Sequence, residues 1–335
     1  MHLVQIANSS RRAVAAVREP DLVLLRDVDS VLTLAQWAVR DGGNLTDAAS
    51  TLLSHETLHY DAVWNGESDW KLLAPIDWPG EPQRVLVSGT GLTHLGSARD
   101  RQAMHRAAAA QPEAQMTDSM RMFEWGRQHG RPDPGAVGIA PEWFYKGDGS
   151  MIQAPFGPLP IPGYAEDGGE EAEVAAIYLI AEDGTPWRIG MAAGNEFSDH
   201  VFEEKNFMYI AASKLMPCAI GPELIIDPDF RSVSGEVNIQ REGKLVWHRD
   251  IRSGEEAMCH SLANLEHHHF KHASHRQPGD IHVHFFGVDA FSFGEGVRLE
   301  NGDVVEIRYS GFGRPLRNPV QVEKAERRRV AVTQL

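Results

Sequence analysis

The chain has 335 residues and a formal net charge of −15, from 47 acidic and 32 basic side chains. This negative charge opposes binding to nucleic acid or to an anionic membrane, but a bound dication can still attract a small anionic substrate into a pocket. No apolar run is long enough to span a bilayer, and the N-terminus lacks the basic start and apolar core of a signal peptide. The two cysteines, Cys218 and Cys259, form no metal or redox pattern, which favours buried thiols in a reducing compartment. We therefore expect a cytoplasmic protein without a membrane segment.

The N-terminal part combines short strand-like runs with two helix-like segments. These segments lie at residues 30–40 and 44–55, and Asn44 is a candidate cap for the second. The mixture predicts a small α/β domain over residues 1–72, to which we assign no chemistry. We expect a larger catalytic domain to follow over residues 73–335.

The predicted catalytic domain begins with a buried-strand pattern at residues 85–88 and a glycine-rich loop at 89–94. A single Gly-x-Gly in this loop is weak evidence for phosphate binding. Ser97 is then expected to cap a helix that continues to residue 110, and a further helix is predicted over 117–129. The aromatic segment 141–146 is expected to form a short strand.

The second half of the chain carries the signals of antiparallel strands. Glu242-Gly243 and Asn301-Gly302 each separate two strand-like runs, which predicts two hairpins. The expected fold class is therefore α+β, mainly β.

An acidic segment that enters a strand is the strongest candidate for a functional site. Glu171 and Glu173 precede the apolar run 174–180, so in a strand their side chains would share one face about 7 Å apart. A turn at Asp183-Gly184 would return the chain and place Glu196 beside them. Three carboxylates with open positions for water and substrate oxygens suit Mg²⁺ or Mn²⁺. The alternative interpretation is a solvated acidic strand end.

Several short motifs occur along the chain in a recognisable order. They are the acidic pair Glu171-x-Glu173, the strand end Asn195-Glu196, the lysine segment 205–214, the Gly-Pro turn in 217–222, the Pro-Glu-aromatic element 141–146, and the Gly-Asp turns at 279–280 and 302–303. In this order and spacing the chain resembles the fumarylacetoacetate hydrolase superfamily, and most of all its 2-keto-3-deoxy-D-arabinonate dehydratase branch. The resemblance covers residues 73–320.

The resemblance implies a mixed β-sandwich roll that assembles as a homodimer or a higher homo-oligomer. It also implies a Mg²⁺ or Mn²⁺ ion held by Glu171, Glu173 and Glu196. The implied catalytic residues are Lys214 and Glu142. The implied contacts to an anionic small-molecule substrate are Lys146, Thr93, His94, Ser97 and His200.

Dehydration of a 2-keto-3-deoxy sugar acid removes a proton from C3 and expels the C4 hydroxyl. A metal that holds the C1 carboxylate and C2 carbonyl would stabilise the enolate. Lys214 could act as the base or bind the carboxylate, although a lysine at a helix end is commonplace. Glu142 could protonate the leaving hydroxyl, or be a surface residue. Lys146 could bind the substrate carboxylate or pair with a neighbour.

Three departures separate the chain from the family pattern. Glu196 stands where the family has Asp, so Asp199 is an alternative third ligand. The hydrolases activate water with a His-x-x-Glu element, but here Ser97 follows His94 at that spacing, which argues against hydrolysis. His200 stands where Arg is common and Gly287-Val288-Asp289 replaces a Gly-Thr element, so the substrate contacts are left open.

The histidines offer a different interpretation. His268 and His272 at i,i+4, and His282 and His284 at i,i+2 on a strand, have spacings that could hold zinc. The helical pair lacks the glutamate of an HExxH motif. We therefore interpret these residues as an exposed polar helix surface beside hydrogen-bonded strand histidines. A transition-metal or pH-sensing role is the alternative.

Together these features predict a metal-dependent dehydratase that converts a 2-keto-3-deoxypentonate into 2,5-dioxopentanoate. One alternative is a C–C bond hydrolase of an acylpyruvate or a 2,4-diketo-3-deoxy sugar acid. Another is a catalytically silent protein that binds a metal or a small acid.

Overall fold

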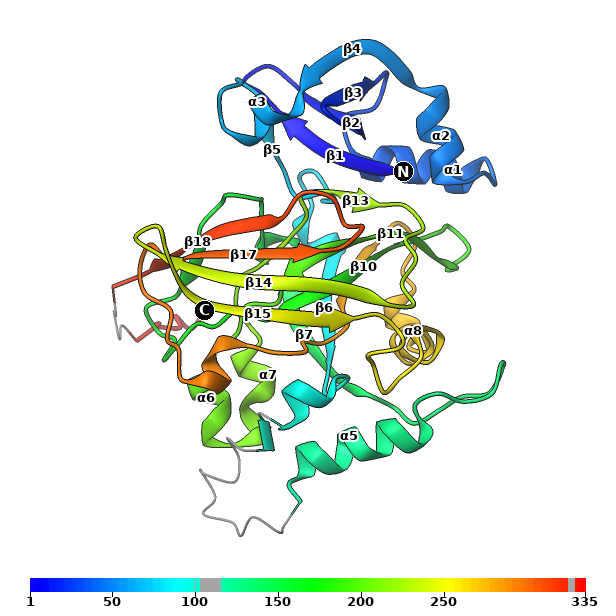
Figure 1. Cartoon of the computed structure of the whole chain (residues 1–335). Helices are drawn as coiled ribbons and strands as arrows, with labels where there is room; N and C mark the ends of the chain where they lie inside the picture. The colour runs from blue at the N-terminus through cyan, green and yellow to red at the C-terminus, as the bar shows by residue number, and fades with distance from the viewer. Residues whose placement is uncertain (100, 103–115, 325–328) are drawn as a thin grey trace.

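The computed structural model describes residues 1–99, 101–102, 116–324 and 329–335. In these residues the chain is mainly β, with two sheets that enclose a common apolar core (Figure 1). The strands are β1 His2–Ala7, β2 Arg12–Arg18, β3 Asp21–Leu25, β4 Leu53–His59, β5 Lys71–Leu72, β6 Val85–Gly91, β7 Glu142–Asp148, β8 Ile152–Gln153, β9 Leu159–Ile161, β10 Ala172–Ile180, β11 Pro186–Asn195, β12 Cys218–Ile220, β13 Leu224–Ile225, β14 Val233–Arg241, β15 Lys244–Ser253, β16 Ile281–Phe285, β17 Val304–Tyr309 and β18 Leu316–Val322.

The helices are short and lie around the sheets. They are α1 Val31–Arg40, α2 Leu45–Thr51, α3 Tyr60–Trp64, α5 Asp118–His129, α6 His200–Lys205, α7 Ile210–Ser213 and α8 Leu262–Phe270, with 3₁₀ turns at Pro82–Arg84, Gly149–Met151, Phe207–Tyr209, Ala273–His275 and Ser292–Glu295. Residues 95–99 and 101–102 are also helical. Among the described residues, none of the helices has the length and apolarity that crossing a membrane requires.

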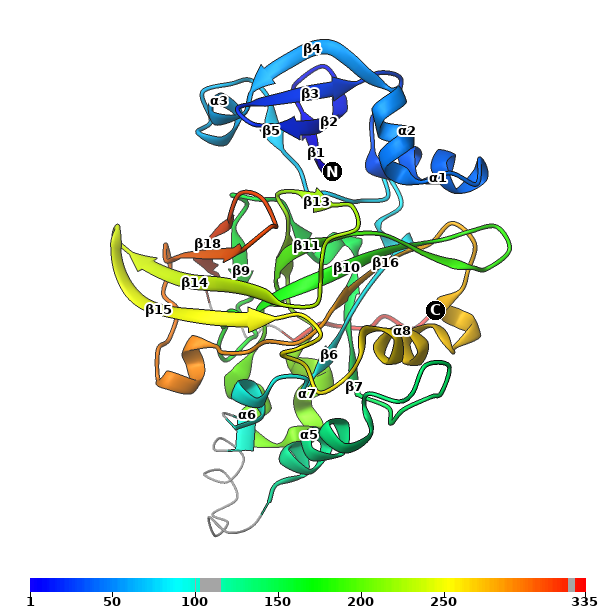
Figure 2. The same cartoon turned by 45° about the vertical axis from the view of Figure 1, so that its right-hand side comes forward.

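The larger sheet runs in the order β4-β3-β2-β1-β13-β11-β10-β16-β6-β7, and the smaller one in the order β15-β14-β17-β18-β9. Both sheets are mixed, because β16 pairs with β6 and β18 with β9 in parallel while most other pairs are antiparallel. The N-terminal strands lie at one end of the molecule (Figure 2). They join the body where β1 pairs with β13, so the larger sheet is continuous through both parts. The predicted boundary between residues 72 and 73 stays a prediction.

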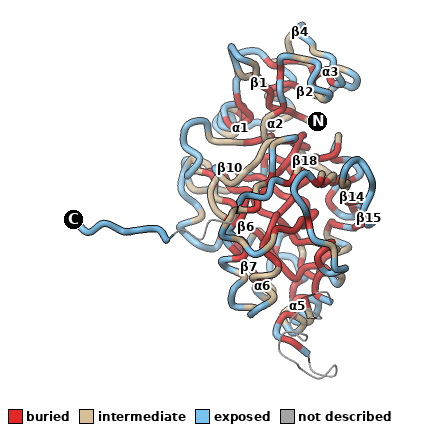
Figure 3. Tube along the Cα trace, turned by 90° about the vertical axis from the view of Figure 1, so that its left-hand side faces the viewer, coloured by how far each residue is buried: buried red, intermediate tan, exposed pale blue. Residues whose placement is uncertain are grey.

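Strand β10 runs through the middle of the molecule, and all nine of its residues are buried. Its alternating side chains enter two different cores: Val174 and Tyr178 pack with the smaller sheet, whereas Ala175 and Ile177 pack toward the N-terminal part. Figure 3 shows this buried centre beneath exposed loops. A strand covered on both faces reads as a continuous apolar run, as residues 174–180 do.

Several predicted elements begin at the expected residues. Ser30 caps α1 and Asn44 caps α2 through their side chains, and Thr117 caps α5. The Glu242-Gly243 turn joins β14 to β15 as a hairpin. Cys218 and Cys259 are buried, free thiols.

Three predictions about local structure are wrong. The helix expected over 44–55 ends at Thr51, because the following residues pair with β3 as strand β4. Ser97 does not cap a helix, since it lies inside the helical residues 95–99 and its Oγ donates to the His94 carbonyl at 3.2 Å. Residues 103–110 of that predicted helix lie outside the described part of the chain. Asn301-Gly302 does not join a hairpin, because β17 pairs with β14 and β18 instead of with residues 297–299.

Candidate metal and acid–base site

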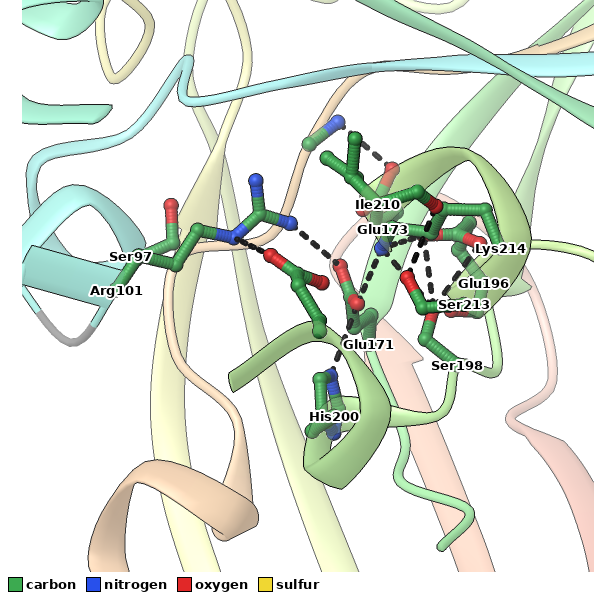
Figure 4. Close-up of polar contacts among 12 residues, drawn as sticks. Ser97, Arg101, Glu171, Glu173, Glu196, Ser198, His200, Ile210, Ser213 and Lys214 are labelled. Atoms are coloured by element: carbon green, nitrogen blue, oxygen red, sulfur yellow. Dashed lines mark hydrogen bonds and ion pairs between the residues drawn. The ribbon is translucent and has the colours of Figure 1, made fainter. Parts of the chain in front are cut away.

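The β10–β11 hairpin brings three glutamates together. Glu173 lies opposite Gly194 in the ladder, and Glu196 donates its backbone N–H to the Glu171 carbonyl at 2.9 Å. All three glutamates are buried, and each offers an oxygen atom within 4.8 Å of the others (Figure 4). The hairpin turns at Asp183-Gly184, and a register shift between Ile177 and Tyr178 lies between this turn and the glutamates, so the turn and the shift together set the pairing that brings the carboxylates together. The predicted role of the three glutamates as metal ligands stays a prediction.

Two buried lysines neutralise part of this cluster. Lys214 ends helix α7 and contacts Glu171 Oε1, Glu196 Oε2 at 2.5 Å and Ser198 Oγ at 3.0 Å. Lys146, from β7, lies 2.6 Å from Glu196 Oε1 and donates to the Phe197 carbonyl. Lys146 therefore pairs with a proposed metal ligand. Its predicted contact with a substrate carboxylate stays a prediction.

A third cation, Arg101, lies on the other side of Glu171. Its Nη1 donates to Glu142 Oε2 at 2.8 Å, its Nε is 3.3 Å from Glu203 Oε1, and its Nη2 is 3.9 Å from Glu171 Oε2. His200 approaches Glu171 as well, with Nε2 3.0 Å from Oε1. The structure thus places Glu142 and His200 beside this cluster. The catalytic role of Glu142 and the substrate contact of His200 stay predictions.

The charges and pKa values of this group are consistent with a bound dication. Five buried carboxylates face three buried cationic side chains, which leaves two excess negative charges when His200 is counted as neutral. Burial and the neighbouring carboxylates of Glu196 and Glu171 raise the pKa of Glu173 well above its usual value. Burial also opposes ionisation of Glu171, but Lys214, His200 and Arg101 outweigh it and lower its pKa. A hard dication bound by oxygen ligands would relieve this excess, so the residues fit Mg²⁺ or Mn²⁺.

The hydrogen bonds of Asp199 favour Glu196 as the third metal ligand. Asp199 caps α6 by accepting the Phe202 N–H at 2.9 Å, and its other oxygen accepts the Glu166 N–H at 2.8 Å. These bonds use both carboxylate oxygens of Asp199. Among the described residues, Asp199 is not part of the group that could hold a metal, whereas Glu196 is.

The predicted substrate contacts near the glycine-rich segment are buried and already hydrogen-bonded. The Thr93 hydroxyl donates to the Phe286 carbonyl at 2.6 Å, and the Ser97 hydroxyl donates to the His94 carbonyl. His94 Nε2 is buried without a hydrogen-bond partner. Burial lowers the pKa of His94 to about 4, so its imidazole is neutral near pH 7. The substrate-binding roles of Thr93, His94 and Ser97 stay predictions.

Sequence reasoning missed Arg101 and Glu203, which are both buried here. Arg101 lies four residues after Ser97, and this helical spacing would place both on one face, but many surface arginines share such a spacing. Glu203 lies on the short helix α6, where a glutamate in the first turn is typical of an exposed position. Only the packing of these helices against the hairpin distinguishes the two residues from surface charges.

The histidines of α8 and β16 form hydrogen bonds outside the acidic site. His284 contacts Ser88 Oγ and Thr90 Oγ1 at 2.9 and 2.6 Å, and His282 contacts His269 at 2.8 Å. The hydrogen-bonded strand histidines are thus confirmed, but the helix surface is not uniformly exposed, because His269 is buried. Within the described ranges, the residue groups with metal-ligand spacing include none of these histidines.

A second such group lies on the surface of the β14–β15 hairpin. It consists of Glu236, His248 and Asp250. Asp250 is 92% exposed and Arg308 lies 3.3 Å from Glu236, so this group has the character of a solvated charged face.

Solved structures of enzymes share this fold. A structure of 2-keto-3-deoxyarabinonate dehydratase matches 96% of this chain and 99% of its own, with a TM-score of 0.70 and 17% sequence identity. Another, of 2-keto-3-deoxy-D-arabinonate dehydratase complexed with magnesium and 2,5-dioxopentanoate, matches 97% of this chain and 100% of its own, with a TM-score of 0.69 and 17% identity. A 5-carboxymethyl-2-hydroxymuconate delta-isomerase from Mycobacterium smegmatis matches 96% of this chain and 100% of its own, with a TM-score of 0.59 and 17% identity.

These comparisons confirm the predicted resemblance at the level of the fold: the chain shares its fold with the dehydratase and isomerase structures, and the dehydratase structures match it with higher TM-scores than the isomerase does. At such low identity they establish the fold and leave the reaction open. No model of a known protein family matches the sequence, and no protein of curated function matches it.

Proposed function

We propose that the protein is a metal-dependent dehydratase of a 2-keto-3-deoxy sugar acid, with a pentonate as substrate and 2,5-dioxopentanoate as product. The observation that carries the proposal is the group of Glu171, Glu173 and Glu196, buried together and in contact with Lys214. The ion that these carboxylates would hold, Mg²⁺ or Mn²⁺, supplies a Lewis acid for the substrate's carboxylate and ketone oxygens.

The chain's own side chains provide the proton carriers that the reaction needs. C3 loses a proton and C4 loses its hydroxyl as water, which leaves a C3=C4 double bond. A proton then moves from C5 to C3 to give a C4=C5 enol, and this enol becomes the aldehyde when its C5 hydroxyl proton moves to C4. Lys214 lies against the ligands and is the candidate that handles the C3 proton. Burial lowers its pKa, but Glu171 and Glu196 raise it more, so Lys214 would act as a base only when a bound dication takes up the charge of these two carboxylates. Glu142 is the candidate acid for the leaving hydroxyl, because burial raises its pKa against the opposing effect of Arg101.

The absence of a glutamate at Ser97 supports dehydration over hydrolysis. A hydrolase of this fold would need a group that activates the attacking water, and Ser97 donates its hydroxyl to a backbone carbonyl. We keep hydrolysis of an acylpyruvate or a 2,4-diketo-3-deoxy sugar acid as the alternative that the assay must distinguish.

One assay separates the candidates. The purified protein with Mg²⁺ is offered 2-keto-3-deoxypentonates and acylpyruvates, and the products are identified by mass spectrometry. We expect loss of one water from a pentonate, and no turnover after treatment with a chelator. Addition of water with release of pyruvate would replace the proposal by the hydrolase. Tight Mg²⁺ binding without any turnover would indicate a silent binding protein.

The proposal includes a cytoplasmic homodimer or a higher homo-oligomer that acts on a small anionic substrate. Light scattering coupled to size-exclusion chromatography tests the assembly, and a monomer at micromolar concentration would contradict it.

A further inference from the structure

Arg101 connects the candidate acid to the proposed metal site. Arg101 is 3% exposed, and its guanidinium reaches carboxylates that come from β7, from the residue before β10 and from α6. Figure 4 shows its approach to Glu171. Of the three contacts, the one to Glu142 Oε2 is the shortest, at 2.8 Å, and it is a hydrogen bond. A buried guanidinium with such partners is strongly oriented, because its planar fork fixes where each carboxylate lies.

The backbone of β6 leaves room for this pair. Gly91 lies opposite Glu142 in the β6–β7 ladder. A Cβ atom at Gly91 would lie 1.8 Å from Glu142 Oε2 and 3.0 Å from Arg101 Nη1. A residue with a side chain at this position would therefore push the carboxylate away from the guanidinium.

The contact uses only one oxygen of Glu142. Glu142 Oε1 is buried and has no hydrogen-bond partner. The charged groups that face Glu142 are Arg101, Glu203 and Lys214. An oriented carboxyl group with one free oxygen is what a proton donor to a substrate needs.

We propose that Arg101 is a positioning residue, which holds Glu142 by Oε2 and leaves Oε1 to transfer a proton at the substrate. The catalytic part of this inference rests on the proposed function. Arg101 acts through Glu142, and Gly91 supplies the space in which they meet.

A double-mutant cycle tests this role. Arg101→Met should lower kcat by about 10²-fold, the lower range for a general acid, and change KM much less. In the Glu142→Gln background, Arg101→Met should lower kcat no further, because the group that it positions is already gone. Arg101→Lys should restore part of kcat, and Gly91→Ala should lower it without removing any charge. Arg121→Met, which removes an exposed arginine of α5 that pairs with Asp118, is the control that keeps full activity.

The alternatives give different results. The proposal would be overturned if the effects of Arg101→Met and Glu142→Gln on kcat multiply in the double variant. It would also be overturned if Arg101→Met raises KM and leaves kcat unchanged, because Arg101 would then bind substrate directly. Mg²⁺ affinity by calorimetry and the melting temperature show whether each variant keeps its site.

A measurement without substrate separates this inference from the proposed function. The ¹³C NMR signal of the Glu142 carboxyl carbon is assigned as the signal that disappears in Glu142→Gln. The pH titration of this signal is then recorded in the wild-type protein and in Arg101→Met. If the wild-type protein turns over none of the substrates, the proposed function fails. The positioning contact is still supported if Arg101→Met shifts the Glu142 titration to higher pH, and it is refuted if the titration is unchanged.

Discussion

The proposed metal binding by the β10–β11 hairpin depends on individual carboxylate side chains. Glu196 is fully buried, and its two oxygens contact Lys146 and Lys214. It stands one methylene longer than the aspartate that the family pattern has, yet the hairpin still places it within reach of Glu171 and Glu173. The structure therefore favours Glu196 over Asp199 as the third ligand, and the two are separable by conservative substitutions.

We expect Glu196→Gln to weaken Mg²⁺ binding about tenfold or more, because affinity for a hard dication depends on the number of charged oxygen ligands. Gln keeps an acceptor for Lys146 or Lys214, so the fold should persist. Asp199→Asn is the matched control: asparagine can still cap α6, although its amide nitrogen cannot accept the Glu166 N–H, and Mg²⁺ affinity should stay the same. Calorimetry measures both. Unchanged affinity in Glu196→Gln with a loss in Asp199→Asn would exchange the two assignments.

At the scale of elements, local signals predicted the hairpin well and its surroundings poorly. The apolar run 174–180 and the turn at Asp183-Gly184 predict the two strands from neighbouring residues alone, but the register at the glutamates also depends on a shift between Ile177 and Tyr178 that the sequence did not indicate. Strand β4 was missed because its residues pair with β3, which no local pattern encodes. Arg101 and Glu203 were missed for the same reason, since their burial depends on how helices pack against the hairpin.

The close packing of β11 on its neighbours gives a test at this scale. A Cβ atom at Gly194 would lie 2.5 Å from Cε1 of Phe285, a fully buried ring on β16. Gly194→Ala should therefore lower the free energy of unfolding by about 1–3 kcal/mol, as overpacking does, and weaken Mg²⁺ binding because Gly194 lies opposite Glu173. Gly43→Ala, after α1, is the control with little effect on either, because the nearest atom to an added Cβ there is the Ala38 carbonyl oxygen at 4.0 Å. Denaturant titrations measure the stability, and equal stability of both variants would contradict this packing.

At the scale of the whole molecule, the sequence predicted an N-terminal domain and a catalytic domain. The continuous sheet that joins the two regions depends on tertiary contacts. The pairing of β1 with β13 joins the N-terminal strands to the sheet that carries the site. Glu223 reinforces the junction, because it is buried and contacts His2 at 2.6 Å and Tyr60 at 3.1 Å. These contacts join residues more than 160 positions apart, so composition and periodicity could not reveal them.

Buried neutral histidines make the stability of the whole fold depend on pH. Burial, with a smaller contribution from neighbouring histidines, lowers the pKa of His284 and His282 to about 3, and burial lowers the pKa of His94 to about 4. An unfolded chain takes up these protons near pH 6.5. Below that pH the unfolded state therefore binds more protons than the folded state, and the free energy of unfolding falls as the pH falls toward 4.

Each such histidine should contribute a slope of about 1.4 kcal/mol per pH unit between pH 6 and 4. His284→Gln should make the fall in stability with decreasing pH shallower by about that amount, whatever it does to stability at pH 8. His267→Gln, an exposed position on α8, should leave the slope unchanged. Urea titrations in a chelating buffer from pH 8 to 4.5 measure the slopes. The raised pKa values of Glu173, Glu196 and Glu142 make the free energy of unfolding rise as the pH falls, which opposes the effect of the histidines. The test is therefore the difference in slope between the variants and the wild-type protein. Identical slopes would refute the neutral state of His284.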